Sequence, residues 1–543
     1  ERLHRWAAAW YTANEMPEKA INHTLAAGDM TQAADLIEQA TVEMLRIRGG
    51  ASTFLTWLAA LPDEIILARP QLCLSQAWAS AFTGQWENLA ERLDYIEANL
   101  IDESDPGRAA RIKGELATLR AELAIFNDSI DTALTLTEQA LRYLPSDNTR
   151  LLTVANQIQG YCYRLNGEIS KAYRALDEAY RLSRQAGVLA TTSFTLQDLA
   201  EVYLINGRLH QAEQTFRQAL ELPAEANIWP FPPACGAFVG LGNLFYERND
   251  LKAARQYLRK GVDLGDQGGY VGYSRRALLS LARLEQSQGH TDAAQAYFRK
   301  AENLVNQRWL IWAKDQVTTF QTRLWLWQGN IKAAGRWADA YQDQADKASP
   351  MPAYQRHTNR VTLARVRLAQ GQPILDDIDR LLSTARAADW INSVIELLIL
   401  KAIACDQAGQ PAEAVDGLQS ALIMAEPEGY IRTFVDEGGP LVKLLRLVDS
   451  SRVSTAYLGQ IQAAFMPAVN ERTVTAQSLI EPLTKRELEV LNLMAEGLSN
   501  QEIADQLILA LGTVAKYSNN IFTKMNVRNR TQAISEAKRL GLI

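Results

Sequence analysis

The chain has 543 residues, which is too long for a single hydrophobic core and indicates several domains or an array of repeats. It is 47% hydrophobic and 22% charged, with a formal net charge of −6, a composition typical of soluble globular proteins. No apolar run reaches the roughly 20 residues that a membrane-spanning helix needs, so we predict no membrane partner.

The reactive residues are few and dispersed. The four cysteines form no CxxC motif, and the five histidines have no metal-ligand spacing. Four cysteines in so long a chain do not make a disulfide framework, which favours a reducing, cytoplasmic setting. The sequence also lacks the GxSxG, GxxxxGK and GxGxxG motifs of hydrolases and nucleotide-binding proteins. We therefore expect no metal site and no enzymatic activity.

The chain opens with ERLHRWAAAWYTANE, which has neither an initiating Met nor a signal-peptide pattern. We therefore expect that the sequence is a fragment or that its true start is not shown. Residues 1–80 are expected to be helical and to begin the array.

A repeat runs through the body of the chain. Four stretches align without gaps: LNGEISKAYRALDEAYRL (165–182), INGRLHQAEQTFRQALEL (205–222), ERNDLKAARQYLRKGVDL (247–264) and SQGHTDAAQAYFRKAENL (287–304). At the same place in each stands a residue suited to the left-handed turn that ends one helix before the next begins, namely Gly167, Gly207, Asn249 and Gly289. Small residues recur at fixed offsets on both sides of these turns, which lets the two helices of a hairpin approach closely.

The repeat predicts an all-α superhelical solenoid over residues 81–465. Large residues between the small ones are expected to fill the space against the next hairpin: Leu176, Phe216, Leu258 and Phe298. Weaker turns extend the array in both directions: Gly84, Asn127, Gly329, Gly371 and Gly409. The spacing of the small residues resembles the tetratricopeptide repeat with helices longer than usual, and a HEAT-like array is the alternative.

Aromatic residues cluster in the middle of this array, in IWPFPPACGAF (228–238) and RWLIWAKDQ (308–316). Trp229, Trp309 and Trp312 could line a ligand pocket on the concave face of the solenoid, or they could belong to the core between repeats. A closed aromatic pocket would favour a small inducer, whereas an open polar groove would favour a peptide or protein partner.

Residues 483–543 are expected to form a small four-helix domain after a linker at 466–482. Two capping boxes, each flanked by a hydrophobic staple, fix where two of its helices begin: Thr484 with Glu487, and Ser499 with Glu502. Only about three residues separate the second of these helices from a third that begins at Leu511. Two short helices joined by so tight a turn predict a helix-turn-helix from about Ser499 to Ser518.

The third helix has two different sides when its residues are rotated by about 100° each. One side should face the core: Val514, Tyr517, Ile521 and Met525. The other side is small, polar and nearly free of acid: Gly512, Ala515, Lys516, Asn519 and Thr523. Because Lys516 could donate to guanine and Asn519 could pair with adenine, this side predicts a DNA-reading face. An ordinary amphipathic surface helix is the alternative.

The stretch LTKRELEVLNLMAEGLSNQEIADQLILALGTVAKYSNNIFTKMNVRNRTQAI resembles the LuxR-type DNA-binding domain, over essentially all of 483–543. With the upstream repeats and EPEGYIRTFVDEG (426–438), the chain resembles the carboxy-terminal part of MalT-type regulators, the large ATP-binding LuxR family. Members of this family begin with an ATPase domain whose phosphate loop is missing here. The resemblance therefore implies ATP as a cofactor only of a domain that this sequence does not contain.

Carried over to this sequence, the resemblance assigns base reading to positions 515, 516 and 519. It assigns phosphate contacts to Thr513, Lys524 and Arg530, and subunit pairing to the helix from Arg530 onward. The full predicted DNA-binding set is Thr513, Val514, Ala515, Lys516, Asn519, Asn520, Lys524 and Arg530. The sequence departs from the family at Ala510, Ala515 and Tyr517, where a capping Ser, a Lys and a His are usual. The missing cap predicts a local loss of about 1 kcal/mol of helix stability.

The resemblance implies a cytoplasmic transcription regulator, more specifically an activator. Its repeats would sense an inducer or a regulatory protein, and its heads would self-associate on double-stranded promoter DNA. A different class of function is also open, a helical-repeat docking scaffold for which a partner protein is the signal rather than a small molecule.

Overall fold

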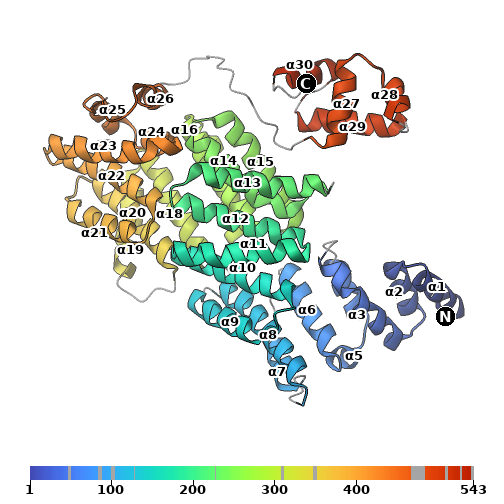
Figure 1. The fold of residues 1–543 in the computed structure, drawn as a ribbon. Helices are drawn as coiled ribbons and strands as arrows, with labels where there is room; N and C mark the ends of the chain where they lie inside the picture. Colours follow the sequence, from blue (N-terminus) through green and yellow to red (C-terminus); the bar gives the residue numbers. More distant parts are fainter. Residues whose placement is uncertain are drawn as a thin grey trace. The chain divides into compact units, whose positions relative to one another are not determined.

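The computed structural model describes residues 1–46, 51–83, 89–99, 104–127, 129–226, 228–306, 311–345, 351–449, 451–465, 483–507, 511–525, 527 and 529–539. Every regular element among these residues is a helix, as the sequence predicted (Figure 1). No helix within these ranges is both long and apolar enough to cross a membrane. The predicted turn at Gly84 and the predicted linker at 466–482 lie outside the described residues.

The chain divides into two compact units. The first comprises Glu1–Asp198 with Trp309–Trp312 and Ala348–Gln355, and the second comprises Leu199–Arg308, Ala313–Lys347 and Arg356–Ile543. The predicted domain boundaries at residues 80, 465 and 483 stay predictions.

The first unit is built from helices that pack with their neighbours in the sequence, most closely α8 with α9 and α10 with α11. Its helices are α1 (Arg2–Ala13), α2 (Pro17–Ala26), α3 (Met30–Arg46), α4 (Ala51–Ala59), α5 (Asp63–Leu67), α6 (Pro70–Thr83), α7 (Leu89–Asn99), α8 (Pro106–Phe126), α9 (Ile130–Tyr143), α10 (Thr149–Asn166) and α11 (Ile169–Ala186). Helix α12 (Leu189–Ile205) crosses from the first unit into the second.

The second unit continues the hairpin pattern, most clearly in α14 with α15, α16 with α17, and α22 with α23. Its repeat helices are α13 (Leu209–Glu225), α14 (Cys235–Glu247), α15 (Leu251–Gly268), α16 (Val271–Ser287), α17 (Thr291–Asn306), α18 (Ile311–Trp327), α19 (Ile331–Ala345), α20 (Ala353–Ala369), α21 (Leu375–Ala387), α22 (Ile391–Gln407) and α23 (Pro411–Ala425). After these come α24 (Arg432–Val435), α25 (Gly439–Leu445), α26 (Thr455–Phe465), α27 (Lys485–Ala495), α28 (Asn500–Leu507), α29 (Leu511–Lys524) and α30 (Arg530–Arg539).

The predicted turns have the backbone that their residues suggested. Gly167, Gly207, Asn249 and Gly289 have φ angles of 73°, 77°, 64° and 79°, in the left-handed region that a helix needs to end abruptly. The weaker turns at Gly329, Gly371 and Gly409 share this conformation. Asn127 also ends a helix, α8, but with a φ of −91°.

Small residues bring the helices of each hairpin together, as predicted. A Cβ atom at Gly160 would lie 2.5 Å from Cγ of Leu176, and a Cβ at Gly242 would lie 2.6 Å from Cγ of Leu258. Each of these leucines therefore packs within its own hairpin, and Leu258 also shares a buried cluster with Ala277 and Leu281 of the next hairpin, as predicted. Phe216 behaves as predicted for a residue facing the next hairpin, because its ring occupies the space beside Gly240 in α14.

The second unit also makes contacts between turns that are far apart in the sequence. Nδ2 of Asn206 donates to the carbonyl oxygen of Asp389 at 3.1 Å. A Cβ atom at Gly207 would lie 2.6 Å from Cγ2 of Ile391, which begins α22. The turn before α13 thus meets the turn before α22.

Residues 426–438, called the inner segment below, leave the hairpin pattern and lie against helices far away in the sequence. The segment contains the one-turn helix α24, and its Phe434 side chain is fully buried. The backbone N–H of Ile431 donates to the carbonyl oxygen of Glu247, at the end of α14, at 3.1 Å. In the sequence, α25 and α26 follow this segment.

Candidate nucleic-acid interface

The four helices α27 to α30 form a head with a hydrophobic core of its own. The backbone N–H of Thr484 donates to Oε2 of Glu487 at 2.8 Å, and the N–H of Glu487 donates to Oγ1 of Thr484 at 3.2 Å. In the same way, the N–H of Ser499 donates to Oε2 of Glu502 at 2.7 Å. Both capping boxes are confirmed, and α27 and α28 begin directly after them.

The predicted core side of α29 faces the interior of the head. Val514 and Ile521 are fully buried and Met525 is nearly so, while Tyr517 lies half-buried at the edge of the core. Val514 was also included in the predicted DNA-binding set. Its burial corrects that assignment, because a side chain with no exposed surface packs in the core and cannot reach a base.

The opposite side of α29 is exposed and carries no acid. Lys516, Asn519, Asn520 and Thr523 are exposed, and Ala515, at the edge of this group, is half-buried. A Cβ atom at Gly512 would meet nothing within 4 Å, so the start of the helix leaves open space for a partner surface. The structure therefore brings the predicted base-reading residues together on one outward side, next to Asn520.

The residues predicted to contact phosphate are placed differently. Nζ of Lys524 lies 2.7 Å from Oε2 of Glu487, and the two side chains are only 8% and 3% exposed. Nη2 of Arg530 donates to the carbonyl oxygens of Met494 and Leu498 at 2.7 and 2.5 Å, which ties α30 to the end of α27. Thr513 is half-buried. A phosphate contact by Lys524 or Arg530 would have to replace these internal contacts, and the predicted role stays a prediction.

A further arginine fixes the helix that precedes the tight turn. Nη2 of Arg486 in α27 donates to the carbonyl oxygen of Leu507, the last residue of α28, at 2.8 Å. This contact holds the end of α28 against α27 just before α29 begins. The missing cap predicted at Ala510 lies outside the described residues.

The predicted ligand pocket is described only in part. Trp309 and the side chain of Trp312 lie outside the described residues. Trp229 is half-buried, and its ring lies edge-on to Phe238 with the ring centroids 6.2 Å apart. Its Nε1 atom is buried and has no hydrogen-bond partner among the described residues. An aromatic pocket formed by the three tryptophans stays a prediction.

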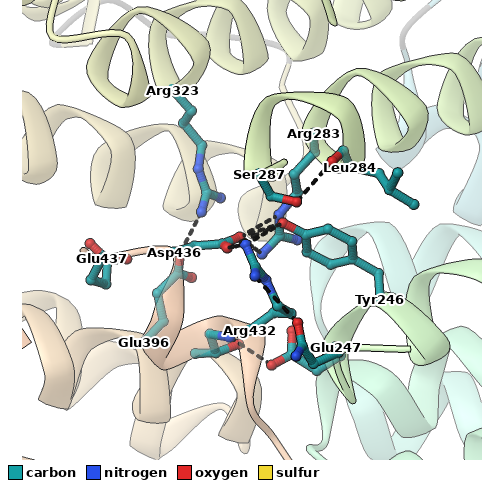
Figure 2. A network of polar contacts seen from close by, with 12 residues as sticks. Tyr246, Glu247, Arg283, Leu284, Ser287, Arg323, Glu396, Arg432, Asp436 and Glu437 are labelled. Atoms are coloured by element: carbon teal, nitrogen blue, oxygen red, sulfur yellow. Dashed lines mark hydrogen bonds and ion pairs between the residues drawn. The ribbon is translucent and has the colours of Figure 1, made fainter. Parts of the chain in front are cut away.

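The sequence did not predict a charged network in the second unit, which Figure 2 shows from close by. The carboxylate of Asp436, in the inner segment, accepts a hydrogen bond from Oη of Tyr246 at 2.9 Å and one from Nε of Arg283 at 3.0 Å. The next residue, Glu437, accepts from Nε of Arg365 at 3.1 Å. The network thus joins the inner segment to α14, α16 and α20.

Charge compensation in this network is uneven. Burial opposes ionisation of Glu396, but Arg365 and Arg323 outweigh it and lower the pKa of that carboxyl to about 2. Burial, followed by the like charge of Arg365, lowers the pKa of Arg323 to about 10. Arg323 lies 3.4 Å from Glu396, which is a long ion pair, so it is the least well compensated of the arginines here.

One sequence signal could have indicated this network. Arg283, Arg323 and Arg365 each stand six residues before a turn glycine, at Gly289, Gly329 and Gly371. Equivalent positions of successive repeats lie on the same face of a solenoid, so three arginines at one position predict a row of positive charge.

The fold and the head together define a helical-repeat protein that carries a helix-turn-helix domain. Comparison with known families agrees with both parts. The chain belongs to the family of the MalT-like TPR region, whose model matches residues 114–451. Residues 481–537 match the model of the bacterial regulatory proteins of the luxR family. The resemblance predicted from the sequence is thereby confirmed.

The curated relatives are regulators. The chain is 25% identical over 565 aligned residues to the HTH-type transcriptional regulator MalT of Yersinia pestis (strain Pestoides F) and to that of Yersinia pseudotuberculosis serotype O:3 (strain YPIII). These alignments cover 99% of this chain and 61% of each relative, so the chain spans less than two thirds of their length.

Among solved structures, a Rap protein complexed with competence and sporulation factor is 11% identical, with a TM-score of 0.42 over 73% of this chain and 99% of that one. The apo form of the quorum sensor NprR from B. thuringiensis is 13% identical, with a TM-score of 0.39 over 70% and 99% of the two chains.

Proposed function

We propose that this chain is a cytoplasmic DNA-binding transcription regulator, an activator, and that it carries out no catalytic step of its own. The outward side of α29 would enter the major groove, while the helical repeats would receive the signal. The names of the curated relatives support the general assignment. The observation that carries the proposal is the acid-free exposed side of α29, with Lys516 and Asn519 one helical turn apart.

The chemistry of this side suits base recognition. The ammonium group of Lys516 can donate to guanine O6 and N7, and the amide of Asn519 can both donate to and accept from adenine. The half-buried Ala515 lies beside Asn519 on the same side and adds no bulk, so α29 can approach the base edges closely. A head of about 60 residues reads few base pairs, and we expect at least two heads on adjacent half-sites.

The test is DNase footprinting of the full chain on promoter DNA that the wild-type protein protects. Lys516→Ala with Asn519→Ala should weaken specific binding by about 2–6 kcal/mol, roughly 30-fold or more in Kd, because each base contact contributes about 1–3 kcal/mol. The matched control is Lys332→Ala with Asn492→Ala, which removes the same groups from exposed positions on α19 and α27. Equal footprints from both double variants would show that the outward side of α29 does not read the bases.

The signal has two candidates, and the first is a small inducer. The buried Nε1 atom of Trp229 supports this candidate, because an unsatisfied donor is free to bind a ligand acceptor. A thermal-shift screen of metabolites on the full chain would find such a ligand. Trp229→Phe, which keeps an aromatic ring but removes the N–H, should then reduce the shift, and an unchanged shift would place the inducer elsewhere.

The second candidate is a partner protein, for which the repeats would be a docking surface. The contacts of the inner segment with α14, α16 and α20 support this alternative, because a segment of a partner protein could make contacts of the same kind.

A further inference from the structure

The inner segment is held in the way that proteins hold a bound peptide. Its backbone N–H groups at Ile431 and Thr433 both donate to Glu247, to the carbonyl oxygen at 3.1 Å and to Oε1 at 2.7 Å. Its Tyr430 and Phe434 side chains are buried as apolar anchors. Main-chain hydrogen bonds, apolar anchors and a few charged contacts are the usual elements of peptide recognition.

Two adjacent carboxylates of the segment then bind the row of arginines. Asp436 forms an ion pair with Arg283 at 2.9 Å, and Glu437 binds Arg365. The side chains of Asp436 and Glu437 are 7% and 14% exposed, so both charges are largely removed from water. Arg283 directs two nitrogens at Oδ2 of Asp436, and Arg365 directs two at Oε1 of Glu437. Such charge-assisted hydrogen bonds are stronger than those between neutral groups.

The segment brings negative charge to the row of arginines. Arg283, Arg323 and Arg365 lie near Glu247 and Glu396, and the segment adds the carboxylates of Asp436 and Glu437 to this cluster. Arg323 lies 3.4 Å from Glu396 and is also attracted by Glu437. Burial of positive charge is unfavourable without anions nearby, so the two carboxylates of the segment stabilise the charged arginines.

These contacts also differ from those expected inside a solenoid. Each repeat of a solenoid normally contacts only its neighbours in the sequence. The inner segment instead contacts helices α14, α16 and α20, which belong to three different hairpins.

We propose that the inner face formed by α14, α16, α18, α20 and α22 is a peptide-binding groove that recognises two adjacent carboxylates. The inner segment is its tethered ligand, and an acidic segment of a partner protein can replace it. The inference rests on the proposed function in one respect, that replacement of the segment would act on DNA binding. The segment precedes α25, α26 and the DNA-binding head in the sequence. The partner is thus defined by its chemistry, an aromatic or aliphatic anchor followed by two neighbouring acids.

The test uses a fluorescent synthetic peptide of residues 428–438, EGYIRTFVDEG, and the full chain. Asp436→Asn with Glu437→Gln should weaken the tethered ligand and free the groove for the added peptide. Tethering supplies an effective concentration of about 1 mM, so a peptide with a Kd of about 10 µM should bind the wild-type chain about 100-fold more weakly than an emptied groove. Fluorescence anisotropy measures both affinities.

Two controls isolate the carboxylates. A peptide with Asn and Gln in place of its Asp and Glu should bind the double variant at least about 10-fold more weakly, in keeping with the loss of charge-assisted hydrogen bonds. A chain with Asp376→Asn and Asp377→Asn, which are exposed on α21, should behave like the wild type. The proposal is overturned if the folded double variant does not bind the peptide. It is also overturned if this variant binds the original peptide and the Asn/Gln peptide with equal affinity.

A second measurement applies if the double variant does not fold. Millimolar peptide added to the wild-type chain should speed amide exchange at Ile431 and Thr433, because it competes with the tethered segment for Glu247. Unchanged exchange at that concentration also overturns the proposal. Neither readout involves DNA, so a failure of the proposed DNA binding would leave both results unaffected and the two failures are distinguishable.

Discussion

The buried ion pair between Lys524 and Glu487 offers a test that separates a structural role from DNA contact. The nitrogen and oxygen lie 2.7 Å apart, and both side chains are almost fully buried. Glu487→Gln preserves the capping box, since Gln also serves at that position, but leaves the charge of Lys524 unpaired. Loss of one partner of a buried pair costs about 3–5 kcal/mol, because the remaining charge is left without compensation.

This loss is large for so small a domain. A head of about 60 residues has an unfolding free energy of only about 3–9 kcal/mol, so the single variant should lose about a third of it or more. The double variant Glu487→Gln with Lys524→Met removes both charges. Its free energy of unfolding should return to within about 1 kcal/mol of the wild-type value. Amide exchange followed by mass spectrometry on the full chain measures the protection of 483–539, with the repeat helices as internal reference.

The double variant then tests DNA contact with a folded head. We expect its binding to show the same dependence on salt as the wild type, because Lys524 is occupied by Glu487. A phosphate contact would instead reduce the slope of log K against log salt by about 0.9. If Glu487→Gln keeps the wild-type protection from amide exchange, the expected loss of stability is wrong. If the double variant reduces the slope of log K against log salt by about 0.9, Lys524 contacts phosphate and its role is not purely structural.

Two further predictions concern the second unit. Burial lowers the pKa of His357 to about 4, below the unfolded value of about 6.5, so the unfolded chain binds its proton first as the pH falls. Relative to His357→Gln, the wild type should keep its free energy of unfolding above pH 6.5 and lose about 2.5 kcal/mol of it by pH 4.5. Urea titrations at a series of pH values measure this difference. An equal dependence of the unfolding free energy on pH in the two proteins would contradict the prediction. Gly242→Ala should destabilise by about 1–3 kcal/mol, because its Cβ would lie 2.6 Å from Leu258, and an unchanged urea midpoint would show that the hairpin can open.

The features that the sequence predicted well are those that a few neighbouring residues determine. Both capping boxes depend on side chains three residues apart, and they place the starts of α27 and α28 correctly. The turn residues Gly207 and Asn249 act through their own φ angles. The outward side of α29 follows from helical rotation alone, which is why Lys516 and Asn519 are exposed as expected.

The features that the sequence did not predict depend on contacts between distant residues. Rotation places Lys524 on α29 but cannot reveal that Glu487, in another helix, pairs with it. Asp436 and Tyr246 are 190 residues apart, and their contact depends on how the repeats between them pack. The small rotation from one repeat to the next is a property of this packing, which a repeat pattern does not specify.

The inner segment changes how a signal can travel through the repeats. Where hairpins contact only their neighbours, a local perturbation acts on the next hairpin alone. Here Asp436 and Glu437 join three repeat helices directly, and the contact of Asn206 with Asp389 joins the turn before α13 to the turn before α22. A complete two-state switch requires about 5.5 kcal/mol, and one broken partner of a buried pair contributes about 3–5 kcal/mol. The two carboxylate contacts together are therefore sufficient to move the segment between a held and a released state, and we expect regulation to act there first and on α29 only as a consequence.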